Sequence, residues 1–196
     1  MFCYQCEQTS KGKGCTAFGV CGKDPTTSDL QDLLIHALKG IAMYAKRASD
    51  LGARDRDIDV FVIEALFTTI TNVNFDPERL QQLLNKAGEI KEKARKLYLE
   101  ASTNDGEDLE GPANWSPADT IDGLLSQAAE VNEERAQRAA LIGADKIGLQ
   151  DLILFGLKGM AAYADHAQIL GVEDEETYAF FHEVLDFLTK QDPTMD

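Results

Sequence analysis

The sequence predicts an all-α protein in which an N-terminal cysteine-rich loop precedes two helical units. Three observations predict this fold. Apolar residues recur every three or four positions through most of the chain after residue 25. Asp-Pro and Ser-Pro pairs and single glycines fall where helices would begin and end. A stretch near the start of the helical part also returns later in the chain, which is typical of a repeated unit.

Residues 1–25 form the predicted loop, since they show no helical or strand period and are interrupted by Gly12, Gly14, Gly19 and Gly22. The same segment holds all four cysteines of the chain, Cys3, Cys6, Cys15 and Cys21. In a cytosolic chain, such clustering indicates a metal site more readily than disulfides. The loop is therefore the predicted cofactor-binding segment.

Residues 26–102 form the first predicted helical unit. Ser28 has the position of an N-cap for its first helix, and Gly52 follows its last turn. The third helix has Asp76 as its predicted cap and Pro77 at its first position. The predicted helices run over about 29–51, over about 58–71 and from residue 77 onward. Short connections between three amphipathic helices predict a three-helix bundle.

Residues 103–118 are polar and rich in glycine and proline, so they are predicted to form a linker. Trp115 is expected to anchor this linker by burying its ring. The Ser116-Pro117 pair is predicted to restart the helical pattern, and the helix that follows is expected to end before Gly143.

Residues 119–196 form the second predicted unit. Residues 30–52 return as residues 149–171, with 13 of 23 positions identical. An Asp192-Pro193 pair stands where the same pair opens the third helix of the first unit, and the sequence ends three residues later. A bundle without its third helix leaves apolar faces uncovered. We therefore expect an incomplete second bundle, either in a fragment or in a chain that borrows the missing helix from a partner.

The composition disfavours several classes of function. A net charge of −15 disfavours nucleic acid as a partner, because phosphates would be repelled. No apolar run reaches the roughly 18 residues of a membrane span. The N-terminus lacks the basic and apolar regions of a secretory signal, so a cytoplasmic location is expected. The three histidines are expected to be ordinary packing or surface residues, namely His36, His166 and His182.

The cysteine spacing C-x2-C-x8-C-x5-C favours an iron–sulfur cluster. Four thiolates suit iron, and the intervening glycines let main-chain N–H groups approach the sulfurs. Structural zinc is the main alternative, although zinc ribbons usually carry two C-x2-C pairs. Redox or free thiols also stay open at this point. The loop lysines are expected to be solvated rather than to dock an acidic electron donor, and they are Lys11, Lys13 and Lys23.

The residues around the cysteines carry a family resemblance. The segment Met1-Phe-Cys-Tyr-Gln-Cys-Glu-Gln-Thr-Ser-Lys-Gly-Lys-Gly-Cys-Thr-Ala-Phe-Gly-Val-Cys-Gly-Lys resembles the opening of a hybrid-cluster protein, of the prismane or hydroxylamine-reductase family. The resemblance continues through Leu30-Gln-Asp-Leu-Leu-Ile, Leu38-Lys-Gly-Ile-Ala, Phe67-Thr-Thr-Ile-Thr-Asn and Leu157-Lys-Gly-Met-Ala-Ala-Tyr-Ala-Asp-His-Ala. It covers almost the whole chain, and in that family this region is a pair of three-helix bundles.

The resemblance implies that one ordinary cluster is bound by Cys3, Cys6, Cys15 and Cys21. The close spacing is similar to members with a [4Fe-4S] cluster, whereas members with wider spacing carry a [2Fe-2S] cluster. Tyr4 and Phe18 flank the cysteines, and they are expected to shield the cluster from water, to pack locally, or to do both.

Family members continue into two α/β domains that hold a hybrid iron–sulfur–oxygen cluster, where hydroxylamine or nitric oxide is reduced. No cysteine follows Cys21 here, so this chain alone is expected to be inactive. It would relay electrons from an electron-donor protein to a hybrid cluster in the missing C-terminal domains. Two other interpretations are a stand-alone iron–sulfur electron-transfer module and a zinc-stabilised helical interaction module.

Overall fold

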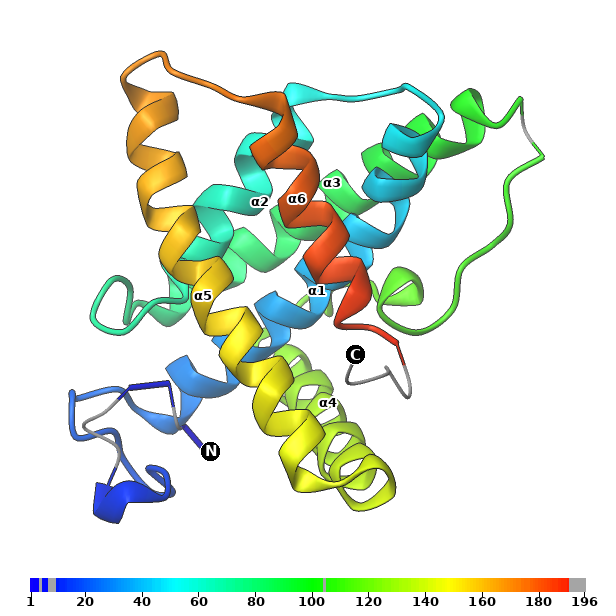
Figure 1. Cartoon of the computed structure of the whole chain (residues 1–196). Coiled ribbons are helices and arrows are strands. Elements are labelled where there is room, and N and C mark those ends of the chain that lie inside the picture. The colour runs from blue at the N-terminus through cyan, green and yellow to red at the C-terminus, as the bar shows by residue number, and fades with distance from the viewer. Residues whose placement is uncertain (4, 7–9, 104, 191–196) are drawn as a thin grey trace.

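The all-α fold is confirmed by a computed structural model, which describes residues 1–190 except 4, 7–9 and 104 (Figure 1). The described part contains six α-helices and no strand. The helices are α1 (Pro25–Asp50), α2 (Arg56–Thr68), α3 (Pro77–Ala101), α4 (Ile121–Ile142), α5 (Ala144–Ile169) and α6 (Glu175–Phe187). Two short 3-10 helices, η1 (Ser10–Gly12) and η2 (Gly111–Asn114), lie in the connecting segments.

Helix α1 begins four residues earlier than the sequence predicts. Its N-cap is Asp24, whose carboxylate accepts a hydrogen bond of 2.6 Å from the Thr27 main-chain N–H. Pro25 occupies the first helical position, where its missing N–H leaves no hydrogen bond unmade. Ser28 is therefore not the cap but a buried residue of the first turn. The Asp-Pro signal that correctly predicts the start of α3 also applies here.

The start of α4 is a second correction. Its cap is Thr120, whose hydroxyl accepts from the Gly123 main-chain N–H, so the Ser116-Pro117 pair stays outside the helix. The end of α4 before Gly143 is confirmed. Gly143 has a φ of 95°, a conformation that favours glycine, and it lets the chain pass directly from α4 into α5.

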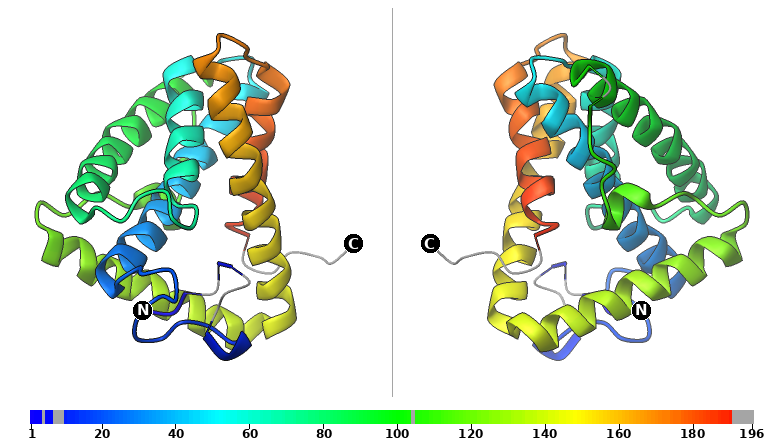
Figure 2. Two further views of the ribbon diagram at one scale, coloured as in Figure 1. Left: turned by 90° about the vertical axis from the view of Figure 1, so that its left-hand side faces the viewer. Right: turned by 90° about the vertical axis from the view of Figure 1, so that its right-hand side faces the viewer.

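The core lies around α1, which packs against α3 on one side and against α4 and α6 on others. The linker crosses α1 at η2, and the burial of the Trp115 ring confirms its predicted anchoring role. The Lys91 ammonium fixes the same segment by donating to the Trp115 carbonyl at 2.7 Å. Figure 2 shows α4 crossing the end of the molecule where the N-terminal loop lies.

Helices at equivalent positions of the sequence repeat have equal lengths. Helices α1 and α5 have 26 residues each, α2 and α6 have 13 each, and each pair is 119 positions apart. The two halves nevertheless interlock, because α6 packs on α1 and α5 packs on α2. A buried contact of 2.6 Å between Asp59 and the His182 ring joins α2 to α6, so His182 is an ordinary packing residue, as expected. The division into separate bundles stays a prediction, and the Asp192-Pro193 pair lies outside the described residues.

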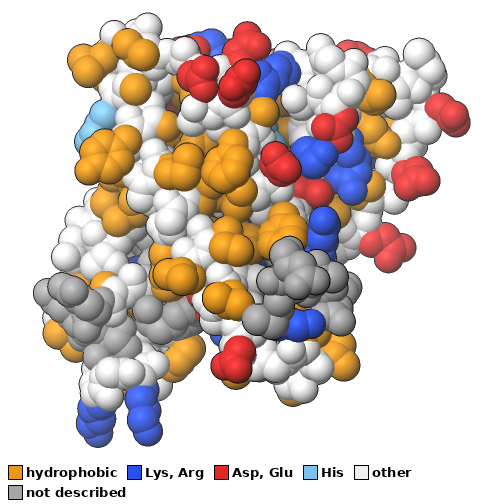
Figure 3. Space-filling model, in the orientation of Figure 1, with side chains coloured by type: hydrophobic (Ala, Val, Ile, Leu, Met, Phe, Trp, Pro, Cys, Tyr) orange, Lys and Arg blue, Asp and Glu red, His pale blue; other side chains and the backbone are white. Residues whose placement is uncertain are grey.

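One face of the molecule is apolar over α5 and α6 (Figure 3). Large apolar side chains are exposed there, including Leu149, Leu152, Ile153, Met160, Tyr163 and Phe180. That a missing third helix would cover this face stays a prediction. Among the described residues, none of the helices is at once long enough and apolar enough to cross a membrane.

Candidate functional site

The cysteine loop is held closed by main-chain hydrogen bonds between Cys3 and Cys15. The Cys3 N–H donates to the Cys15 carbonyl at 3.0 Å, and the Cys15 N–H donates to the Cys3 carbonyl at 2.7 Å. The Cys15 sulfur accepts from the Ser10 N–H at 3.5 Å. This hydrogen bond, together with another from the Val20 N–H, lowers the pKa of the Cys15 thiol. The main chain thus favours a thiolate at this position.

The four cysteines are all free of disulfides. Cys3 and Cys15 are buried, while Cys6 and Cys21 are half-buried. A Cβ atom at Gly19 would lie only 3.1 Å from the Cys21 sulfur, so the glycine permits a close main-chain approach there. Within the described residues, no three His, Cys, Asp or Glu side chains are grouped to hold a metal ion. Convergence of the four sulfurs therefore stays a prediction.

Lys23 corrects one expectation, because its side chain is 0% exposed rather than solvated. Its ammonium donates to the Gln31 side-chain carbonyl at 2.5 Å and lies 5.9 Å from the centre of the Phe75 ring. The Gln31 amide in turn donates to the Asn74 carbonyl at 2.8 Å. Lys23 thus ties the end of the cysteine loop to α1 and to the segment before α3. Lys11 and Lys13 are exposed, as expected.

Lys158, on α5, is a second buried cation beside the loop. Its side chain is 4% exposed, and its ammonium donates to the Gln5 side-chain oxygen at 3.3 Å. Burial lowers its pKa to about 8, although the neighbouring Asp32 and Cys3 favour the charge. Burial likewise raises the pKa of the Asp32 carboxyl to about 6, against the effect of Lys158.

The donor set fits an iron–sulfur cluster in its chemistry. Thiolates are soft ligands, main-chain N–H groups stabilise their negative charge, and buried ammonium groups do the same at longer range. The shielding expected from Phe18 is not observed, because this side chain is exposed. Tyr4 lies outside the described residues.

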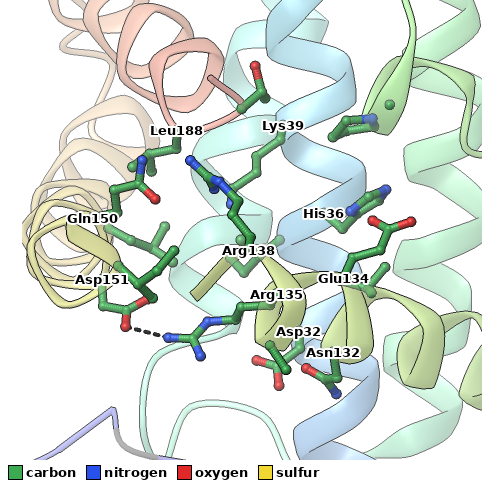
Figure 4. A pocket seen from close by; sticks show the side chains of 18 of the residues that line it. Asp32, His36, Lys39, Asn132, Glu134, Arg135, Arg138, Gln150, Asp151 and Leu188 are labelled. Carbon is green, nitrogen blue, oxygen red and sulfur yellow. Dashed lines mark hydrogen bonds and ion pairs between the residues drawn. The ribbon is translucent and has the colours of Figure 1, made fainter. Parts of the chain in front are cut away.

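A cavity of about 1070 Å³ lies next to the loop, between α1, α4 and α5 (Figure 4). The Arg135 guanidinium and the Asp151 carboxylate form an ion pair of 2.5 Å on its wall. Sequence reasoning missed this cavity. The sequence repeat does carry a signal for it, because two polar positions are identical in both copies and line the cavity from both. They are Asp32 and Lys39 on α1, and Asp151 and Lys158 on α5.

His36 also lines the cavity, and it gives the protein a predicted pH dependence. Burial, and secondly the charge of Lys39, lowers the pKa of the His36 ring to about 4. The unfolded chain therefore binds a proton at higher pH than the folded one, so this residue costs stability as pH falls from about 7 towards 4.

We expect His36→Gln to remove this cost. From pH 7 to pH 5, the free energy of unfolding of the variant should rise by about 2 kcal/mol relative to the parent chain. Urea unfolding at both pH values measures this difference. A constant difference between the two proteins would contradict the lowered pKa.

Comparison with known proteins identifies the family. The family model described as the prismane/CO dehydrogenase family matches residues 1–195. The chain belongs to the prismane/CO dehydrogenase family. The match includes the cysteine loop, the buried lysines beneath it and all six helices.

Curated relatives of this family member are named hydroxylamine reductase. The relative from Rhodospirillum rubrum is 49% identical over 195 residues, covering 97% of this chain and 35% of the relative. The relative from Syntrophobacter fumaroxidans is 46% identical over 192 residues, covering 98% and 35%. The relative from Geobacter sulfurreducens is 48% identical over 192 residues, covering 94% and 34%. The chain thus spans about a third of the length of these relatives.

Proposed function

We propose that this chain is the cluster-carrying N-terminal portion of a hydroxylamine reductase of the hybrid-cluster type. In this proposal one [4Fe-4S] cluster is held by Cys3, Cys6, Cys15 and Cys21. The observation that supports it most is the closed loop, in which the Cys15 sulfur accepts two main-chain N–H groups beside two buried lysines. These N–H groups and lysines would stabilise a structural zinc site less, because zinc does not take up an additional electron and its negative charge.

A bound cluster of this kind supplies one-electron transfer. The residues of this chain fix the thiolates and offset the negative charge of the site. Lys23 and Lys158 do so from buried positions, where a charge acts more strongly than it would in water. None of the loop side chains needs to act as an acid, a base or a nucleophile.

Reduction of hydroxylamine or nitric oxide would take place at a hybrid cluster outside this chain. The relatives are about three times longer than the segment they share with it, which leaves room for such a site. The proposed partners are a cytoplasmic electron-donor protein and the remaining domains of the parent. The proposed role lies in nitrogen metabolism, and this chain alone should not reduce hydroxylamine.

Anaerobic reconstitution with iron and sulfide tests the proposal. We expect a brown protein with about four irons per chain and an electron paramagnetic resonance signal on reduction. Cys15→Ser should lose most of the iron, because an alcohol is a poor ligand for iron in such clusters. Lys11→Met changes an exposed residue of the same loop and should retain it.

Two results would count against the proposal. A colourless protein with one zinc per chain would favour the zinc-stabilised module. Reduction of hydroxylamine by the isolated chain would show that no further domains are needed.

A further inference from the structure

Two hydrogen-bond donors in the cavity have no acceptor among the described residues. The Lys39 ammonium makes no hydrogen bond or ion pair with any described residue. The Gln150 side chain is only 8% exposed, and its Nε2 atom is buried without a hydrogen-bond partner among the described residues. Both residues line the cavity, and Figure 4 shows them extending into it from α1 and α5. A buried donor without an acceptor is costly, so the Gln150 amide indicates a ligand that supplies an oxygen atom, and the half-buried Lys39 ammonium is a second donor for it.

The repeat provides an independent comparison. Lys158 and Gln31 occupy the equivalent positions in the other copy, and both of them bind an oxygen atom. The Lys158 ammonium donates to Gln5, and the Gln31 amide donates to a main-chain carbonyl. The same two side-chain types thus bind oxygen acceptors at the equivalent positions of the repeat, although Gln31 itself does not line the cavity.

The charges nearby favour an anion rather than a neutral acceptor. Arg138 lies close enough to Lys39 for the two positive charges to repel. Burial, followed by this repulsion, lowers the pKa of Lys39 to about 8, although Asp151 and Asp32 favour its charge. Asp151 is itself in an ion pair with Arg135. A negative charge beside Lys39 and Arg138 would offset their repulsion.

Figure 4 shows the other ionisable groups of this wall. Glu134 and His36 both line the cavity, and Figure 4 shows them on the far side of Lys39 from Gln150. His36 is uncharged at neutral pH because its pKa is about 4. The Arg138 guanidinium also donates to the main-chain carbonyl of Lys190.

We propose that Lys39, Gln150 and Arg138 form a carboxylate-binding site. A carboxylate has two oxygens, so it can accept from the ammonium and from the amide at once, and its charge is opposite to that of the ammonium. The carboxylate can belong to a small molecule or to an acidic side chain of a protein segment. This site is separate from the proposed cluster ligands, and it does not depend on the cluster being bound.

The test uses the 196-residue chain and two probes. Sodium acetate represents a small carboxylate, and a blocked Gly-Glu-Gly tripeptide represents an acidic side chain. Sodium chloride at equal ionic strength is the control for screening. We expect one or both carboxylates to raise the melting temperature in a saturable manner, and Lys39→Met to weaken that binding at least tenfold. Lys96→Met, which removes an exposed lysine of α3, should leave it unchanged.

A second measurement does not depend on the Lys39→Met variant. In ¹⁵N-labelled protein, the side-chain amide protons of Gln150 should shift downfield as the bound probe accepts a hydrogen bond, and Gln150→Leu identifies their signals. A response to acetate alone assigns the site to small molecules, and a response to the tripeptide alone assigns it to acidic side chains. If neither probe differs from chloride, or if Lys39→Met binds as well as the parent chain, the proposal is wrong.

Discussion

Replacing Gly40 by alanine is expected to destabilise the fold by about 3 kcal/mol, because the linker main chain crosses α1 at this point. A Cβ atom on Gly40 would lie 2.7 Å from the carbonyl carbon of Pro112 and closer still to its oxygen. Main chain cannot move aside as the end of a flexible side chain can. The η2 segment would have to separate from α1 and would take the buried Trp115 ring with it.

The repeat supplies a matched control for this prediction. Gly159 occupies the equivalent position on α5 and is exposed, and a Cβ atom added to it would meet no described atom within 4 Å. Gly159→Ala should therefore stabilise the protein by about 0.5–1 kcal/mol, as alanine does in an open helical position. Chemical unfolding of both variants measures the contrast. Equal effects at the two positions would show that the linker does not press on α1.

The helices were largely predictable because their signals are local. An Asp-Pro pair and a helical period are enough to place α3, and a glycine marks the end of α4. The starts of α1 and α4 differ from the predicted ones because several cap residues compete within a few positions. Asp24 precedes Ser28, and Thr120 follows Ser116, and only one residue of each pair meets free N–H groups.

The packing between the halves was not predictable, since the apolar face of a helix does not specify which other helix it packs against. The pattern of α6 is satisfied equally by α5, its neighbour in sequence, and by α1, on which it packs. The buried contact between Asp59 and His182 depends on that choice, and the two residues are 123 positions apart. No local rule connects them.

The candidate site was predictable in part. The cysteine pattern identified the loop, but the burial of Lys23 did not follow from a lysine that stands among glycines and charged residues. Burial of a lysine depends on the acceptor that it meets, and here the acceptor is Gln31 on α1. The cavity required both copies of the repeat to be placed in space, because its polar residues come from α1, α4 and α5.

Replacing Lys23 by alanine is expected to lower the free energy of unfolding by about 3 kcal/mol, as much as the change at Gly40. The change removes a completely buried side chain and leaves the Gln31 side-chain oxygen without its donor. It also removes the contact with the Phe75 ring. Since the Lys23 carbonyl accepts from the Gly19 N–H at 2.8 Å, the end of the cysteine loop should loosen as well.

Two further variants separate packing from charge. Lys23→Met retains most of the buried volume but not the charge, so it should cost less stability, about 1.5–2 kcal/mol. Lys11→Ala alters an exposed lysine of the same loop and should change stability by less than about 0.5 kcal/mol. Urea unfolding and limited proteolysis of the loop are the measurements.

The reconstituted protein links this residue to the proposed function. If Lys23 offsets the negative charge of the cluster site, Lys23→Met should lower the midpoint potential, whereas Lys11→Met should leave it nearly unchanged because water screens an exposed charge. Potentiometric titration followed by electron paramagnetic resonance measures both. A potential that does not respond to Lys23→Met, together with a loss of stability, would limit this lysine to holding the loop on α1.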